Sequence, residues 1–189
     1  MVRRAVFLDR DGVINANLER NGKPVAPTRF DEFRILPGVE HAARALKARG
    51  FLLIIATNQP DVANGLTSRN EVDAMHDEIR RRLPIDDIMV CFHSENDNCS
   101  CRKPKPGMLL EAGKRHALDL ASSYFVGDRW RDVEAGRAAG CFTFFIDYGH
   151  VQDRPAIPDK IVRSLAEAAN FILTHERSRL NSDPARTRI

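Results

Sequence analysis

Three of the four cysteines lie close to one histidine, as Cys91, His93, Cys99 and Cys101. Three thiolates and an imidazole complete a tetrahedral zinc shell with no open position, so the pattern predicts a structural zinc site. The polar residues 94–98 bury too little apolar surface to order themselves, whereas structural zinc contributes on the order of 10 kcal/mol in small peptides. A redox pair is the alternative, but the C-x-C spacing differs from the thioredoxin-like C-x-x-C.

Carboxylates follow two short apolar runs of the chain. Asp9 and Asp11 come directly after the first run, and Asp128 and Asp132 follow a later one. Carboxylates at the end of a buried strand lose solvation, and a hard divalent cation compensates that loss. If the two strands are neighbours, the side chains of Asp9 and Asp128 and the carbonyl of Asp11 can share one Mg²⁺.

A hydroxyl, an amide and a lysine complete a possible site for phosphoryl transfer. Thr57 and Asn58 end another apolar run, and Lys103 precedes a helical segment. Each of these features, taken alone, is common in an ordinary turn or at the end of a strand. Together they supply a nucleophile, an acid and base, hydrogen-bond donors for phosphoryl oxygens and neutralising cations, so their joint occurrence favours catalysis.

The elements that must position these residues alternate along the chain. Five continuous apolar runs predict strands buried on both faces, at residues 5–8, 51–57, 88–92, 124–126 and 142–146. Helical periodicity and caps predict helices at residues 39–49, 68–83, 107–118, 130–139 and 165–173. This order predicts a three-layer, Rossmann-like parallel sheet with helices on both faces and its ligand at the carboxyl ends of the strands.

Length and charge set the broad class. With 189 residues and 43% hydrophobic content, we expect one domain over residues 1–173 and a flexible tail over 174–189. The net charge of +3 gives little support to a nucleic-acid partner. No apolar run is long enough for a signal peptide or a membrane span, so we expect a soluble, cytoplasmic protein. We see no apolar surface stripe that argues against a monomer, so we expect a monomer.

The four motifs resemble those of the haloacid dehalogenase superfamily. The match covers residues 4–150 and includes Asp9-x-Asp11, Thr57, Lys103 and Asp128-x-x-x-Asp132. The resemblance implies that Asp9 is the nucleophile and that Asp11 is the general acid and base. It also implies that Thr57 and Lys103 hold the phosphoryl oxygens. Asp11 favours a phosphatase over a dehalogenase.

The same resemblance assigns the metal. It implies a Mg²⁺ site made by Asp9, Asp11 and Asp128, with Asp132 orienting either Lys103 or a metal-bound water.

The cysteine and histidine stretch narrows the resemblance. Its position directly before Lys103 is similar to the group that contains heptose 1,7-bisphosphate 7-phosphatases and bacterial histidinol-phosphatases. This implies a small sugar phosphate as substrate, with histidinol phosphate or another small metabolite as the alternative, and no large cap domain. The residues expected to contact substrate are Asn15, Asn58, Gln59, Arg102 and Arg129.

One segment departs from that group. Heptose bisphosphatases usually carry N-Q-[SA]-G-[IV]-A-R-G after the second motif, whereas this chain has Pro60 and Asp61 in place of the small pair and Asn64 in place of the arginine. The loss of a cation and the gain of an anion weaken the assignment to a doubly phosphorylated sugar, but leave the chemistry unaffected.

A zinc-dependent nucleic-acid-binding module is the non-enzyme alternative. It requires basic and aromatic residues around the metal site. Glu95 and Asp97 lie inside the cysteine and histidine stretch instead. We therefore expect an enzyme.

Overall fold

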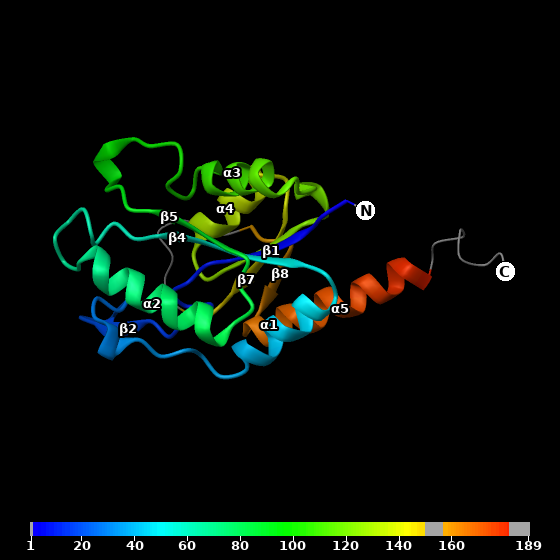
Figure 1. Ribbon diagram of the computed structural model, residues 1–189, viewed down its shortest axis with the longest axis horizontal. Helices are drawn as coiled ribbons and strands as arrows, with labels where there is room; N and C mark the ends of the chain where they lie inside the picture. The colour runs from blue at the N-terminus through cyan, green and yellow to red at the C-terminus, as the bar shows by residue number, and fades with distance from the viewer. Residues whose placement is uncertain (1, 150–156, 182–189) are drawn as a thin grey trace.

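A parallel β-sheet forms the centre of the computed structural model, which describes residues 2–149 and 157–181 (Figure 1). Within these ranges the strand order is β5-β4-β1-β6-β7-β8, and neighbouring strands run parallel. In that order the strands span Asp87–Cys91, Leu52–Asn58, Ala5–Leu8, Tyr124–Gly127, Phe142–Ile146 and Lys160–Val162. The five predicted strands are confirmed. Sequence analysis missed β8 because this short edge strand leaves Ile161 exposed and so shows no apolar run.

Helices cover both faces of the sheet, as predicted (Figure 1). One face packs against α3 (Gly107–His116) and α4 (Trp130–Ala138). The other face packs against α1 (Val39–Ala48), α2 (Arg69–Arg82) and α5 (Leu165–Asn181). The result is a three-layer α/β fold.

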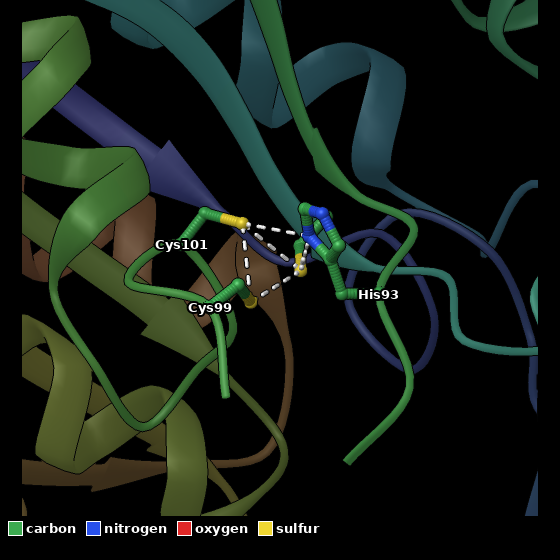
Figure 2. Close-up of side chains that lie close together, drawn as sticks. His93, Cys99 and Cys101 are labelled. Carbon is green, nitrogen blue, oxygen red and sulfur yellow. Dashed lines mark hydrogen bonds between the residues drawn. The ribbon is translucent and has the colours of Figure 1, made fainter. Parts of the chain in front are cut away.

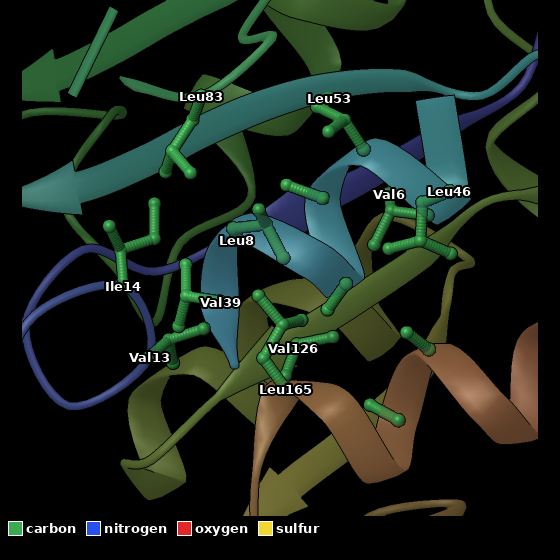
Figure 3. Close-up of a cluster of buried hydrophobic side chains, with 14 of the residues drawn as sticks. Val6, Leu8, Val13, Ile14, Val39, Leu46, Leu53, Leu83, Val126 and Leu165 are labelled. Atoms are coloured by element: carbon green, nitrogen blue, oxygen red, sulfur yellow. The ribbon is translucent and has the colours of Figure 1, made fainter. Parts of the chain in front are cut away.

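The alternation of buried side chains along β1 explains its continuous apolar sequence. Val6 and Leu8 belong to the larger core cluster under α1 and α5, which Figure 3 shows. Ala5 and Phe7 belong to the smaller cluster under α3 and α4. A strand that is covered on both faces needs an apolar residue at every position.

The start of α2 departs from the predicted capping box. Ser68 accepts a hydrogen bond from the backbone N–H of Glu71 at 3.2 Å, as a cap should. The Glu71 carboxylate, however, accepts from the backbone N–H of Phe30 at 2.5 Å. It therefore joins α2 to η1 (Phe30–Glu32) instead of closing the box.

The first part of the predicted tail, residues 174–181, is helical. Helix α5 continues to Asn181, beyond the boundary that the sequence predicted at residue 173. Glu176 is the reason, because its buried carboxylate accepts hydrogen bonds from Tyr124 at 3.0 Å and from Arg4 at 2.5 Å. Because these contacts are polar, the sequence shows no apolar stripe that would predict the end of the helix. The rest of the predicted tail, residues 182–189, lies outside the described residues.

Only small elements lie between β1 and α1 in the described chain. An antiparallel hairpin of β2 (Leu18–Arg20) and β3 (Lys23–Val25) is followed by η1. Two further 3-10 turns, η2 (Glu95–Asp97) and η3 (Leu120–Ser122), lie elsewhere. Within the described residues, no large cap domain is inserted between β1 and α1. None of the described helices is both long and apolar enough to cross a lipid bilayer.

Candidate active site and metal centres

The carboxylates lie at the point where the strand order of the sheet reverses, between β1 and β6. The chain builds β1, β4 and β5 outward and then returns to place β6 on the other side of β1. Asp9 follows β1 and Asp128 follows β6, and these two strands are neighbours. The backbone N–H of Asp9 donates to the Val126 carbonyl at 2.9 Å. Such a switch point leaves a crevice at the carboxyl ends of the strands. Carboxylate oxygens of Asp9, Asp128 and Asp132 lie within 4.8 Å of one another there.

Two glycines allow this close approach. Gly12 has a φ of +81°, and a Cβ at that position would lie 2.1 Å from Oδ2 of Asp128. A Cβ on Gly127 would lie 2.1 Å from the Cβ of Asp132. Any larger residue at either position would displace the carboxylates.

Lys103 is the buried cation of this cluster. Its Nζ lies 2.8 Å from Oδ1 of Asp9 and 2.6 Å from Oδ1 of Asp132. Burial acts against the charged ammonium, but the carboxylates of Asp132 and Asp9 outweigh it and raise the pKa of Lys103. Oδ2 of Asp132 accepts from the backbone N–H of Arg129 at 2.9 Å. Both oxygens of Asp132 are thus engaged, which suits it to orient Lys103.

The cluster carries excess negative charge. The carboxylates of Asp9, Asp128 and Asp132 face the buried Lys103, and Nε of Arg129 lies 3.6 Å from Oδ2 of Asp128, so three negative charges meet two positive ones. Burial and the charge of Asp132 raise the pKa of Asp9 to about 7. Burial and the same neighbour raise the pKa of Asp128 well above its ordinary value.

An unpartnered oxygen adds to the case for a cation. Oδ1 of Asp128 is buried without a hydrogen-bond partner among the described residues, while Oδ2 accepts from Asn17 at 3.0 Å. A hard divalent cation such as Mg²⁺ fits these oxygen donors and this charge. Sequence analysis missed Asn17, whose surrounding residues show no motif.

Asp11 is held by three polar side chains. The fully buried Arg10 contacts both carboxylate oxygens of Asp11 at 3.0 Å, Asn15 donates at 2.9 Å and Gln59 donates at 2.8 Å. Burial alone would raise the pKa of Asp11, but the charge of Arg10 and these hydrogen bonds lower it below its ordinary value. Arg10 was missed because an arginine between two acidic residues in a loop is usually exposed to solvent.

Two residues expected to contact substrate lie behind the site instead. Asn15 and Gln59 are both buried, and neither is among the residues that line the cavity at Asp9. Gln59 donates to the hydroxyl oxygen of Thr57 at 2.9 Å and accepts from Arg10 at 3.0 Å. The Asn15 amide group donates to Asp11, and that of Gln59 donates to Asp11 and to Thr57, because buried polar groups are held by hydrogen bonds.

The other three expected contacts line a cavity of about 240 Å³ above the carboxylates, which we call the catalytic cavity. Asn58 also clasps the backbone of Lys103, donating to its carbonyl and accepting from its N–H, both at 3.1 Å. Arg129 donates to the carbonyl of Pro24 in the hairpin at 3.0 Å. Arg102 and the unpredicted Arg131 complete the cationic wall.

The predicted zinc ligands converge in the Cys/His loop, residues 91–101. Figure 2 shows His93, Cys99 and Cys101 pointing toward one another. Cys101 Sγ lies 3.2 Å from Cys91 Sγ and 3.4 Å from Cys99 Sγ, and His93 Nδ1 lies 3.3 Å from Cys101 Sγ. Zinc bonds of about 2.0–2.3 Å place tetrahedral donors roughly 3.5–3.8 Å apart, so the set fits the ion with small adjustments. The separations exceed the roughly 2.0 Å of a disulfide.

The Cys/His loop connects directly to the active site. Cys101 precedes Lys103 by two positions. Arg102 donates to the carbonyl of His93 at 3.2 Å, and the ammonium of Lys105 donates to the carbonyl of Cys99 at 2.8 Å. An ion in this loop would therefore restrain the backbone that delivers Lys103.

Comparison with known proteins gives concordant matches. Residues 100–168 match a family model described as HAD-hydrolase-like. The D-glycero-beta-D-manno-heptose-1,7-bisphosphate 7-phosphatase of Bordetella bronchiseptica is 36% identical over 78% of this chain and 82% of its own length. The D-glycero-alpha-D-manno-heptose-1,7-bisphosphate 7-phosphatase of Campylobacter jejuni is 38% identical over 77% of this chain and 83% of its own length.

A solved structure extends the match to the fold. The D,D-heptose 1,7-bisphosphate phosphatase of B. bronchiseptica, complexed with magnesium and phosphate, superimposes with a TM-score of 0.77 at 31% identity. The alignment covers 91% of this chain and 99% of that one.

Proposed function

Since the chain belongs to the haloacid dehalogenase superfamily and is a phosphatase, we propose that it hydrolyses the 7-phosphate of D-glycero-D-manno-heptose 1,7-bisphosphate. Family membership supports an enzyme over the nucleic-acid-binding alternative. The observation that carries the proposal is the position of Asp9, at the end of β1 beside Lys103 and open to the catalytic cavity. The similarity to heptose bisphosphate phosphatases supports the choice of substrate.

The arrangement supports a two-step hydrolysis. An oxygen of Asp9 attacks phosphorus, the ester bond to the sugar breaks, and Asp11 donates a proton to the departing alkoxide. Asp11 then takes a proton from water, which attacks the aspartyl-phosphate and releases inorganic phosphate. The lowered pKa of Asp11 favours its ionised form, which accepts the proton in the second step. The negative charge of a bound phosphate raises the proton affinity of Asp11 for the first step.

The proposal includes two metals. Side chains of Asp9 and Asp128 and the carbonyl of Asp11 would hold Mg²⁺, which neutralises phosphoryl charge. Asp132, engaged by Lys103 and the Arg129 backbone, would position Lys103. Cys91, His93, Cys99 and Cys101 would hold a structural Zn²⁺. The family neighbour solved with magnesium supports the first metal, and the donor geometry supports the second.

The requirement for Mg²⁺ is expected to increase at low pH. The raised pKa of Asp9, about 7, means that protons compete with the cation for the carboxylates. A single competing proton with this pKa weakens apparent Mg²⁺ affinity about ten-fold between pH 8 and pH 6. The Mg²⁺ concentration that gives half-maximal phosphate release measures this. An unchanged concentration at the two pH values would contradict the proposed carboxylate site.

The segment after β4 bears on the choice of substrate. Pro60 lines the catalytic cavity, and burial together with the charge of Asp11 raises the pKa of Asp61. An anion there is unfavourable for a bisphosphate. Arg102, Arg129 and Arg131 offset it from other elements. The proposed substrate therefore keeps its support despite the altered loop.

Substrate comparison provides the test of the proposal. Values of kcat/KM for the α and β anomers of the heptose bisphosphate, histidinol phosphate and several sugar monophosphates would be measured in Mg²⁺. We expect one of the two bisphosphate anomers to exceed all the other esters. A preference for histidinol phosphate would replace the proposed substrate and leave the phosphatase chemistry standing.

We further propose that the enzyme acts as a cytoplasmic monomer on its phosphorylated metabolite. Light scattering coupled to gel filtration would give the mass in solution, for comparison with the 21.3 kDa of one chain. A doubled mass would replace this part of the proposal.

A further inference from the structure

A buried histidine that the proposed mechanism does not use lies in α2. His76 is 3% exposed and shares the inward face of the helix with Met75. Met75 belongs to the same core cluster as Leu8 and Val13, which lie before and after Asp11 in the chain (Figure 3). The inward face of α2 therefore packs against the segment that carries Asp11.

Three side chains of this region, those of Arg10, Asn15 and His76, each bury a polar atom that has no hydrogen-bond partner among the described residues. The atoms are Nη1 of Arg10, Oδ1 of Asn15 and Nε2 of His76. Through their other nitrogens, Arg10 and Asn15 both donate to Oδ1 of Asp11, at 3.0 and 2.9 Å. Buried polar groups are rarely left unsatisfied, so all three atoms require a partner.

The guanidinium of Arg10 has the largest electrostatic effect on His76 among the described charges. Burial and then the charge of Arg10 lower the pKa of His76 to about 3, while Arg80 acts in the same direction and Asp11 in the opposite one. The imidazole is therefore neutral, and one of its ring nitrogens can accept a hydrogen bond. A neutral acceptor leaves the positive charge of Arg10 directed at Asp11, whereas a carboxylate in its place would compete for that charge.

One water molecule can satisfy all three atoms. It accepts from Nη1 of Arg10 and donates to Oδ1 of Asn15 and Nε2 of His76, and about three hydrogen bonds are usual for a buried water. We propose that His76 is a positioning residue that, through this buried water, fixes Arg10 and thereby the orientation of Asp11. In the proposed phosphatase function, on which this inference rests, Asp11 is the acid and base.

Nitrogen NMR tests the contact without turnover. The shifts of the ring nitrogens of His76, assigned by their loss in His76→Gln, distinguish the two neutral tautomers from the charged ring. We expect Nδ1 to carry the proton from pH 8 down to pH 5, because the water donates to Nε2. A charged ring, or a proton on Nε2, at pH 7 would overturn the proposal.

The kinetic test compares His76→Leu with His76→Gln. Leucine cannot accept a hydrogen bond, whereas the amide oxygen of glutamine can take the place of Nε2. We expect kcat for the preferred ester to fall about ten-fold in His76→Leu, the effect of losing a hydrogen bond to a charged group. KM should stay within about two-fold, because the change does not touch Lys103. His76→Gln should keep most of the wild-type kcat.

Met75→Leu is the matched control. Met75 is also buried in α2, and the exchange roughly conserves volume. This variant should keep the wild-type kcat and a similar melting temperature. A kcat within two-fold of wild type in His76→Leu, or a loss in His76→Gln as large as that in His76→Leu, would refute the positioning role.

p-Nitrophenyl phosphate identifies the step that depends on His76. Its phenolate leaves without a proton, so formation of the aspartyl-phosphate on Asp9 does not need Asp11, but hydrolysis of this intermediate does. Rapid mixing of His76→Leu should therefore show a burst approaching one p-nitrophenolate per enzyme, larger than in wild type and in Met75→Leu. Equal bursts in the three proteins would contradict an effect that passes through Asp11.

The outcomes distinguish failure of this inference from failure of the proposed function. If the wild type hydrolyses no phosphate ester while His76 shows the expected tautomer, the phosphatase function fails and the contact between His76 and Arg10 stands. If the wild type hydrolyses esters and His76→Leu behaves like Met75→Leu, the positioning role fails and the phosphatase function stands.

Discussion

Replacement of Asp9 by asparagine is expected to lower phosphate release by at least about 10³-fold, because an amide cannot form the acyl phosphate. The exchange preserves the shape of the side chain. Its oxygen can still accept from the backbone N–H of Arg10, a bond of 2.7 Å in the structure. Steady-state release of inorganic phosphate from the preferred ester provides the measurement.

The fold should survive the Asp9→Asn change. The ionised carboxylate of Asp9 is destabilised in the folded chain, as its pKa of about 7 indicates. In the folded chain this penalty is fully present above that pH, so the metal-free variant should melt at or above the wild-type temperature at pH 8. Asp77→Asn, on the exposed face of α2, is the matched control and should keep full activity. An active Asp9→Asn enzyme, or a beryllofluoride adduct on another residue, would refute the assigned nucleophile.

Loss of the proposed zinc site is expected to have the second large effect. We expect Cys101→Ser to purify without its equivalent of zinc and to lose most phosphatase activity, since Lys103 follows two positions later. The free energy of zinc binding, about 10–16 kcal/mol in zinc-finger peptides, orders a loop that has little apolar surface of its own. Metal analysis and hydrogen exchange across residues 91–103 measure the two consequences.

Cys141→Ala is the control for the zinc prediction. Cys141 is buried in the core under α3 and α4 and lies outside the Cys/His loop. This variant should retain zinc and the protection of residues 91–103, with a modest loss of stability from the smaller side chain. Stoichiometric zinc in Cys101→Ser would show that the proposed ligand set is wrong.

Prediction of the fold from sequence succeeded where local chemistry and tertiary burial agree. The run that became β1 is apolar at every position because both of its faces are covered. β8 escaped prediction because Ile161 is exposed, and the last turns of α5 escaped it because polar contacts, such as Glu176 with Tyr124, hold them in place. A buried hydrogen bond between distant positions leaves no periodic pattern in the sequence.

The sequence by itself predicted the carboxylates, the threonine and the lysine of the candidate site. The order of Asp9, Thr57, Lys103 and Asp128 along the chain indicated phosphoryl transfer, because each residue follows or precedes an element whose end reaches the same edge of a parallel sheet. The spacing of the cysteines and His93 indicated a metal shell in the same way. These inferences need only strand order and ligand chemistry.

Only the tertiary structure decided which side chains face a ligand. Asn15 and Gln59 turn inward to hold Asp11, whereas Asn17 turns toward Asp128 and Arg131 reaches the cavity wall. The direction of a polar side chain depends on the charges and donors that packing brings beside it from distant segments. A buried carboxylate must be satisfied by whichever groups arrive, and that selection is made by the assembled fold.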